Sequence, residues 1–306
     1  MLEYNVSLSG IKRIGNIAAC IGYFDGLHLG HQQLVNKTIQ LAKENRLSSA
    51  LITFDPDPWV VLKGIGSIEH ITSIEQRKKI VADLGIDIWI SIEFTKELAA
   101  LDPNVFIDEV ITALGVKELV CGFDFSFGKF GIGTTETLQS CDKFNTTVIE
   151  AVKKEGVKIS STLIEENIIK GNVKLANELL TRPFTIISTV IHGRNRGKGI
   201  GFPTANIDVN GIYVIPKVGV YAGSILYANE KYSAVINVGY NPTFNKRDDI
   251  SIECHLINFE GDLYGETIEV EFLDFLREER KFANVAELTE QINKDIEHVK
   301  ESYSNR

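Results

Sequence analysis

The hydrophobic pattern of this chain changes near residue 181, and this change constrains the fold more than any other feature. Before residue 181, short apolar runs alternate with stretches in which apolar residues recur at helical spacing. Such alternation is typical of a parallel sheet with crossover helices. After residue 181, β-rich runs follow at close spacing, separated by Gly, Asn and Pro. The sequence therefore predicts an α/β domain over residues 1–181 and a β-rich domain over residues 182–306.

The N-terminal domain is predicted to be doubly wound, with helices on both faces of a parallel sheet. The predicted strands are residues 18–24, 50–54, 88–92, 118–121 and 147–152. Apolar side chains at helical spacing mark two helices between them, with Leu34, Val35, Thr38, Ile39 and Ala42 in one and Ile80, Val81 and Leu84 in the other.

The C-terminal domain is predicted to be an antiparallel barrel, because its β-rich runs have no helices between them. The predicted strands are residues 184–190, 220–226, 233–238, 250–257 and 267–272. A final helix is expected to begin near Asn284, a residue type favoured at helix N-caps. Its apolar residues fall on a single stripe and are Val285, Leu288, Ile292, Ile296 and Val299.

Composition and charge exclude several classes of protein. No run in the 306 residues approaches the roughly 18 apolar residues that a membrane span needs, so a membrane protein is not expected. Residues 1–10 lack the basic start and apolar core of a signal peptide, and we expect a cytoplasmic location. A net charge of -9 repels a phosphate backbone, which disfavours nucleic acid as a partner. The sequence makes no prediction of oligomeric state.

The 4 cysteines are far apart in the sequence and form no C-x-x-C pair. A zinc site or a disulfide framework is therefore not expected. We interpret Cys20, Cys121, Cys141 and Cys254 as buried thiols.

Residues 22–31 read GYFDGLHLGH and lie between a predicted strand and a predicted helix. Glycines at such a junction allow close backbone approach, and the free amides at the helix N-terminus can bind phosphate. His28 and His31 can donate hydrogen bonds to a triphosphate and stabilise charge as pyrophosphate leaves. The alternative is a glycine-rich turn with two surface histidines.

Residues 193–206 read GRNRGKGIGFPTAN and combine glycines, cations and a Pro-containing turn. The loop amides can surround phosphates, while Thr204 and Asn206 offer neutral oxygens to Mg²⁺. The segment is neither a Walker A sequence nor a protein-kinase glycine-rich loop. The alternative is a basic, glycine-rich hairpin.

These motifs resemble those of the prokaryotic bifunctional riboflavin kinase/FMN adenylyltransferases. Residues 22–31 resemble the H-x-G-H signature of the nucleotidyltransferase superfamily, and the similarity continues through residues 53–56, 121–128 and 159–162. Residues 203–206, 219–223, 237–244, 253–256, 262–265 and 276–282 resemble the riboflavin kinase module. The resemblance implies a Rossmann-like nucleotidyltransferase domain followed by a Greek-key β-barrel with a terminal helix.

The resemblance also implies the ligands and the site residues. The substrates would be riboflavin, FMN and ATP, with Mg²⁺ bound by Thr204 and Asn206. Glu253 would be the catalytic glutamate of the kinase, and His28 and His31 would contact the ATP phosphates. The other implied binding positions are Gly22, Phe24, Asp25, Gly30, Asp124, Ser161, Thr162, Gly199, Gly201, Pro203 and Arg277.

Glu253 also suits the chemistry of such a kinase. A primary alcohol is a poor nucleophile at neutral pH, so a carboxylate that accepts its proton is useful. We expect Glu253 to face the mouth of the barrel; the alternative is a solvated surface residue. Aromatic side chains lie near the two motifs in the sequence, and they are Phe123, Phe125, Phe127, Tyr240 and Phe244. They can pack against a flavin ring, and the alternative is that they belong to the hydrophobic core.

Three positions depart from the family pattern. Asp57 stands where members usually have His, and Ser126 and Glu165 stand where they usually have Arg. Lysines close in sequence to these positions are candidates to replace the missing cations, and they are Lys129, Lys153, Lys154 and Lys158. Two alternatives therefore remain beside the bifunctional enzyme: a kinase with a degenerate adenylyltransferase domain, and a flavin- or nucleotide-binding regulator. The acidic charge, the small size and the missing K-M-S-K-S segment argue against an aminoacyl-tRNA synthetase.

Overall fold

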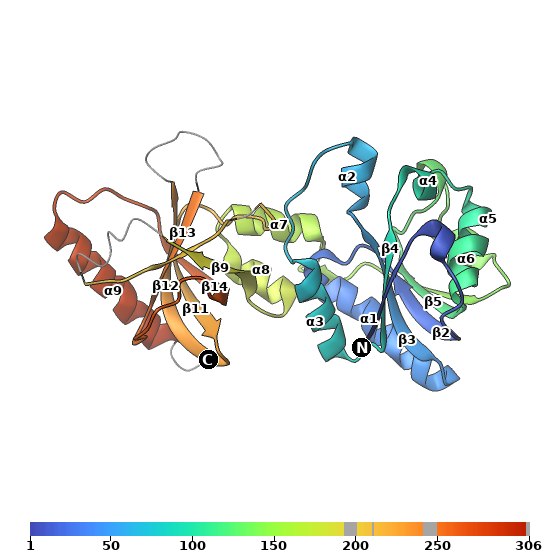
Figure 1. Cartoon of the computed structure of the whole chain (residues 1–306), viewed down its shortest axis with the longest axis horizontal. Helices are drawn as coiled ribbons and strands as arrows, with labels where there is room; N and C mark the ends of the chain where they lie inside the picture. The colour runs from blue at the N-terminus through green and yellow to red at the C-terminus, as the bar shows by residue number, and fades with distance from the viewer. Residues whose placement is uncertain (193–200, 210, 241–249, 304–306) are drawn as a thin grey trace. The chain divides into compact units, whose positions relative to one another are not determined.

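The computed structural model describes residues 1–192, 201–209, 211–240 and 250–303 (Figure 1). The chain forms two compact units. One unit consists of Met1–Ile68 and Ser73–Ser160, and the other consists of Glu69–Thr72 and Ser161–Arg306.

The N-terminal unit is built on a six-stranded sheet in which every pairing is parallel. Its strands are β1 (Leu2–Val6), β2 (Ile17–Ile21), β3 (Ser48–Asp55), β4 (Ile88–Glu93), β5 (Val116–Gly122) and β6 (Asn145–Ile149). Its helices are α1 (Leu29–Asn45), α2 (Pro58–Lys63), α3 (Ile74–Leu84), α4 (Lys96–Ala99), α5 (Pro103–Phe106), the π-helical η3 (Ile107–Thr112) and α6 (Thr135–Gln139). Short 3₁₀ turns are η1 (Leu8–Gly10), η2 (Asp25–Leu27) and η4 (Lys129–Gly131), and a small hairpin pairs β7 (Lys153–Lys154) with β8 (Val157–Lys158).

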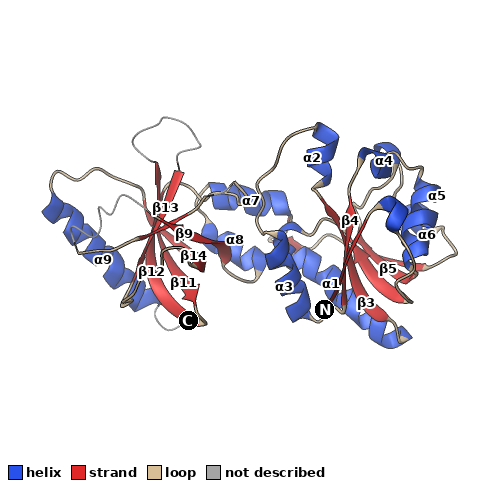
Figure 2. Cartoon of the chain, viewed as in Figure 1, coloured by secondary structure: helices blue, strands red, loops and turns tan. Residues whose placement is uncertain are grey.

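Helices cover both faces of this sheet, as the doubly wound layout predicts (Figure 2). One core contains Leu51 and Trp89 of the sheet together with Val35 of α1 and Val81 of α3. The other core joins the opposite faces of the same strands to α5, η3 and α6. The strand order β1-β4-β3-β2-β5-β6 reverses between β2 and β5, and ligands of such sheets bind beyond the carboxyl ends of the strands at this reversal.

The structure corrects two details of the predicted sheet. The strand before residues 22–31 is the second along the chain, because β1 was not predicted and lies at the edge of the sheet beside β4. Strand β2 ends at Ile21, whereas residues 18–24 were expected to be extended. Phe24 cannot continue the strand because it has a left-handed backbone with a φ of 61°.

The second unit contains a closed antiparallel barrel. Its strands are β9 (Phe184–Ile191), β10 (Ala205–Ile207), β11 (Gly219–Tyr227), β12 (Glu230–Tyr240), β13 (Ile250–Leu256) and β14 (Thr267–Arg277). Strand β14 returns to pair with β11, on the other side from β12 and β13, which is the 4-1-2-3 order of a Greek key. Strand β10 was not predicted, because three residues beside a proline give little periodic signal.

Among its described residues, the second unit has three helices beside the barrel: α7 (Ser161–Ile169), α8 (Val173–Leu180) and α9 (Val285–Tyr303). The predicted cap is confirmed, since Asn284 Oδ1 accepts a 3.0 Å hydrogen bond from the amide of Glu287. Ile296 and Val299 of α9 pack against the outer faces of β11 and β12. Within the described residues, no helix is both long and apolar enough to cross a bilayer.

The four thiols are free, and Cys20, Cys121 and Cys254 are buried as predicted, whereas Cys141 is half-buried. Burial raises the pKa of Cys20 to about 12 and that of Cys121 to about 11. These thiols are therefore not nucleophiles near neutral pH.

Candidate active sites

The first candidate site is the turn that leads from β2 into α1. Three backbone features shape it: the left-handed Phe24, the positive φ of Gly26 and the positive φ of Leu27. The ring of Phe24 is buried in the core, so this predicted ligand contact is a packing residue in the structure. Gly22 fits this packing because a Cβ at that position would lie 3.3 Å from the Phe24 ring.

His28 is the N-cap residue of α1. Its Nδ1 accepts hydrogen bonds from the amides of Gly30, at 3.1 Å, and His31, at 3.3 Å. These amides are therefore not free, contrary to the sequence prediction, because the His28 ring occupies the place of an external anion. Gly30 permits this arrangement, since a Cβ there would lie 3.0 Å from His28 Cε1. With Nδ1 accepting, a neutral His28 ring carries its proton on Nε2.

His31 stacks on His28, with ring centroids 3.8 Å apart. Burial of the His31 ring lowers its pKa well below the usual range, and the neighbouring His28 and Arg77 act in the same direction. Its Nδ1 is buried and has no hydrogen-bond partner within the described part of the chain. A hydrogen bond between His31 and the backbone of Asp25 acts in the opposite direction on this pKa, but more weakly than burial.

A buried ion pair holds this turn to α3. Arg77 Nη2 lies 3.2 Å from Asp25 Oδ1, and the two side chains are only 2% and 6% exposed. Arg77 also donates to the carbonyl oxygen of Tyr23 at 3.3 Å and covers the Tyr23 ring. Asp25, a predicted binding residue, is thus engaged by a partner that the sequence analysis missed. The available signal was a cation on the apolar stripe that ends at Val81 and Leu84.

The segments after β5 and β8 contribute another charged pair. Asp124, a predicted binding residue, is exposed and its Oδ2 lies 2.5 Å from Lys158 Nζ. Lys158 also covers the exposed ring of Phe123 at 4.7 Å. Phe125 and Phe127 stack on each other, and Phe127 is buried in the core. Of these three aromatic residues, Phe123 is therefore the most exposed.

The three departures from the family pattern have different surroundings. Asp57 is buried and caps α2, its Oδ1 accepting a 2.6 Å hydrogen bond from the amide of Trp59. Ser126 is exposed, and Glu165 lies half-buried on α7. Ser161 and Thr162, two further predicted contacts, begin α7 in the unit that contains the barrel.

The second candidate site lies on β10 and β13 of the barrel. Thr204 Oγ1 donates a 3.3 Å hydrogen bond to Glu253 Oε2. Asn206 lies directly opposite Glu253 in the antiparallel register, so their side chains share one face. The structure thus brings together the predicted catalytic glutamate and both predicted metal ligands, which are about 50 residues apart in the sequence.

This face is the outside of the barrel wall rather than its mouth, which corrects the prediction for Glu253. Its strand neighbours Ile252 and Cys254 are buried inside the barrel, and alternation turns Glu253 outward. His255 faces the same way, with Nδ1 2.9 Å from the carbonyl oxygen of Pro203. That contact holds β13 to the segment that carries Thr204.

Arg277, another predicted binding residue, ends β14 and binds α9. Its Nη2 lies 2.8 Å from Asp295 Oδ2, and its Nε also donates to that carboxylate. Gly201 is exposed with a φ of 88°, and Pro203 is exposed beside it. Gly199 and Phe244 lie outside the described residues.

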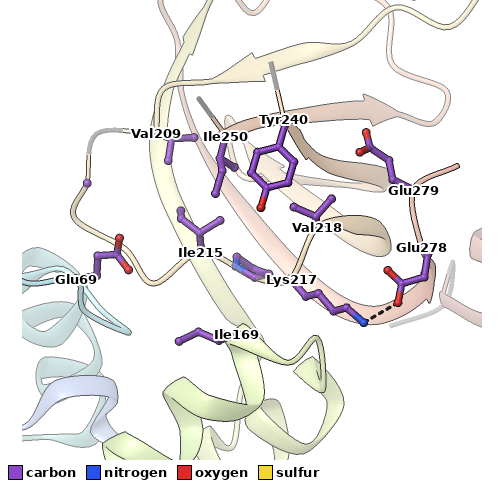
Figure 3. A pocket seen from close by; sticks show the side chains of 12 residues that line it. Glu69, Ile169, Val209, Ile215, Lys217, Val218, Tyr240, Ile250, Glu278 and Glu279 are labelled. Carbon is purple, nitrogen blue, oxygen red and sulfur yellow. Dashed lines mark hydrogen bonds and ion pairs between the residues drawn. The ribbon is translucent and has the colours of Figure 1, made fainter. Parts of the chain in front are cut away.

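Cavities border the barrel, and two of them concern the predicted site residues. One of about 500 Å³ is lined by Pro203 and Thr204 together with the segment after β13, including Phe259 and Tyr264. The other, of about 640 Å³, lies at one end of the barrel and is lined by Ile215, Val218, Tyr240 and Ile250 (Figure 3). Lys217 pairs with Glu278 at its rim, with Nζ 2.6 Å from Oε1.

The donor set of the second site fits Mg²⁺ better than a transition metal. A hydroxyl, a carboxamide and a carboxylate lie on one face, and Mg²⁺ binds through a few such oxygens together with substrate phosphates. Among the residues that the structure describes, no cluster of three or more His, Cys, Asp or Glu side chains is arranged to hold a metal ion.

Together, an α/β sheet with a histidine turn and a barrel with an outward glutamate define a two-domain transferase that acts on phosphates. Comparison with known proteins agrees with this class. An FAD synthetase family model matches residues 11–163, and a riboflavin kinase family model matches residues 180–303.

Bifunctional riboflavin kinase/FMN adenylyltransferases are similar along almost the whole chain. The protein of Listeria monocytogenes is 41% identical over 283 residues, which cover 92% of this chain and 90% of the relative. The protein of Bacillus subtilis is 40% identical over 290 residues, which cover 93% of this chain and 92% of the relative. A crystal structure described as a macrolide-efflux protein from Streptococcus pneumoniae has a TM-score of 0.90, with 32% identity over 99% of this chain and 100% of that one.

The chain therefore belongs to the bifunctional riboflavin kinase/FMN adenylyltransferase family. It is an enzyme with both activities of that family, riboflavin kinase and FMN adenylyltransferase. The bifunctional interpretation of the sequence is thus confirmed.

Proposed function

We propose that Glu253 is the general base of riboflavin phosphorylation and that Thr204 and Asn206 hold Mg²⁺ beside it. The hydrogen bond from Thr204 Oγ1 to Glu253 Oε2 is the observation that carries this assignment. It places the base and the metal ligands on one face of β10 and β13, where a metal-bound phosphate and an alcohol would meet.

In this mechanism the ribityl primary hydroxyl attacks the γ-phosphorus of ATP. Its proton passes to the Glu253 carboxylate as the new oxygen–phosphorus bond forms, and the bond to the ADP oxygen breaks on the opposite side. When bound, Mg²⁺ supplies charge neutralisation for the phosphate oxygens. The cavity beside Pro203 and Thr204 is the place that we assign to the nucleotide.

We assign adenylyl transfer to the turn between β2 and α1. A phosphate oxygen of FMN attacks the α-phosphorus of ATP, and pyrophosphate leaves. The depressed pKa of His31 keeps its ring neutral at pH 7, so His31 can donate a hydrogen bond to the departing phosphate without a proton transfer. His28 donates through Nε2, because its Nδ1 accepts the amides of α1.

The remaining predicted contacts complete the proposal. Asp124 would lie beside the flavin or nucleotide, and Ser161 and Thr162 beside the adenylate phosphates. We retain residues 1–181 and 182–306 as the two functional domains, which assigns α7 to adenylyl transfer although it lies in the compact unit of the barrel. A cytoplasmic location stays a prediction.

The kinase assignment is tested by Glu253→Gln, which removes the base at nearly constant volume. We expect riboflavin turnover to fall by about 10² to 10⁴, with riboflavin binding largely intact. Glu230→Gln at the β11–β12 turn is the matched control and should leave turnover unchanged. Near-wild-type turnover of the Glu253→Gln enzyme would remove Glu253 from the mechanism.

A further inference from the structure

A second asparagine flanks Glu253 on the side opposite to Asn206. In the barrel, β13 lies between β10 and β12. Glu253 is the register partner of Asn206 on β10 and of Asn237 on β12. A single row across three strands thus places the carboxylate between two carboxamides.

The three side chains of this row point to the outside of the barrel. The strand neighbours of Asn237, Ile236 and Val238, are buried in the interior, and Asn237 itself is half-buried. Directly opposed residues of antiparallel strands have Cβ atoms roughly 5 Å apart, which puts the Asn237 carboxamide within reach of any group that contacts Glu253.

The Asn237 side chain makes no hydrogen bond to any residue that the structure describes. Gly239 lies on the same outer face and is buried beside the Glu279 side chain. A Cβ at Gly239 would lie 3.1 Å from Asn237 Nδ2 and 2.6 Å from Glu279 Oε1. A half-buried, unpaired carboxamide beside a catalytic carboxylate indicates a contact with a polar ligand.

The geometry of phosphoryl transfer decides which ligand this is. The attacking and leaving oxygens lie in line on opposite sides of the transferred group. Thr204 and Asn206 of the β10 side hold the nucleotide in the proposed function, so the acceptor alcohol approaches from the β12 side. We propose that Asn237 binds the ribityl chain of riboflavin through the 4′-hydroxyl, which adjoins the hydroxyl that is phosphorylated.

A carboxamide suits this role because it can both donate to and accept from a hydroxyl. The contact holds the polyol so that its terminal oxygen faces Glu253, and it makes Asn237 a specificity residue for flavins with a hydroxylated side chain. The sequence carried a signal for it, since Asn237 is the polar residue at an alternate position within the apolar run Val235–Val238 of β12.

The inference rests on the proposed function of Glu253, and the experiment separates the two. Wild type, Asn237→Ala and Glu253→Gln are assayed for kinase kcat/KM with riboflavin and with 4′-deoxyriboflavin. Ser233→Ala is the control, because Ser233 lies on the same face of β12, four residues or roughly 13 Å along the strand. Asn237→Ser is included because it keeps a short polar side chain. The FMN adenylylation activity of each sample is also measured, to show that the protein is folded.

We expect Asn237→Ala to lower kcat/KM for riboflavin about 5- to 10-fold, the range of one neutral hydrogen bond. For wild type, kcat/KM should be lower with 4′-deoxyriboflavin than with riboflavin by a similar factor. With 4′-deoxyriboflavin as substrate, Asn237→Ala should lower kcat/KM by less than about a further twofold. If Asn237→Ala lowered kcat/KM by the same factor for both substrates, the proposed role of Asn237 would be overturned and that of Glu253 would stand. A Glu253→Gln enzyme with wild-type turnover would instead overturn the proposed base.

Discussion

The two active sites of this chain are built in opposite ways. The turn after β2 buries its polar groups, since Asp25 and Arg77 are almost inaccessible to solvent and His28 caps a helix from inside the protein. The barrel row leaves Glu253, Asn206 and Asn237 half-exposed on the outside of a closed wall. A substitution in the buried turn should therefore cost stability as well as activity, whereas one in the barrel row should cost activity alone.

The largest effect on stability should follow from Arg77→Met, which leaves Asp25 buried and without its cation. Breaking a buried pair by removing one partner typically costs about 3–5 kcal/mol of unfolding free energy. Denaturant unfolding of the N-terminal unit would measure this loss. The double variant Arg77→Met/Asp25→Asn should recover part of it, and a single variant with wild-type stability would contradict the importance of the buried pair.

His31→Ala should have the next largest effect, and on one activity only. Loss of a positioned donor to a developing charge typically lowers turnover by about 10² to 10³. FAD formation from FMN should fall by this factor, while riboflavin phosphorylation stays at the wild-type rate because its proposed residues lie on β10 and β13 of the barrel. Unchanged FAD formation would exclude His31 from adenylyl transfer.

Asn206→Ala should weaken magnesium-dependent kinase activity about tenfold, because it removes one of few oxygen ligands. A magnesium titration of riboflavin phosphorylation measures the shift, and the melting temperature should not change. The same magnesium dependence in variant and wild type would count against the proposed metal ligands.

Glu165→Arg should give a smaller change, in the direction of a gain. A carboxylate near a polyphosphate repels it, and solvent screening limits the effect to roughly a few-fold. The KM for ATP in FAD formation should fall, with riboflavin phosphorylation unaffected. An unchanged KM would show that Glu165 does not face the nucleotide.

The smallest effect concerns pH. Burial lowers the pKa of His31 in the folded state, whereas the unfolded chain keeps the ordinary histidine pKa of about 6.5. As pH falls below about 6.5, the unfolded chain therefore binds a proton at His31 before the folded protein does. The contribution of neutral His31 to the free energy of unfolding is complete above that pH and is lost as pH falls toward the folded-state pKa. Denaturant unfolding between pH 7 and 5 should show this loss, and His31→Gln should remove it. An identical pH dependence in both proteins would contradict the depressed pKa.

The same contrast explains what the sequence could predict. The histidine turn was predictable because its residues are contiguous and follow a strand. Its anchor was not, because Arg77 reaches Asp25 from a helix 52 residues later and the apolar stripe alone does not reveal the contact. The main barrel strands were predictable from their composition, but β10 was too short to recognise and the outward direction of Glu253 depended on which face closed the barrel.

Adenylyl transfer and riboflavin phosphorylation use separate residues, and one time course tests this directly. Purified wild type, Glu253→Gln and His31→Ala are incubated with riboflavin, ATP and magnesium, and FMN is resolved from FAD by chromatography. Glu253→Gln should form almost no FMN yet convert added FMN to FAD at the wild-type rate, while His31→Ala should accumulate FMN without FAD. Parallel loss of both activities in either variant would contradict the account.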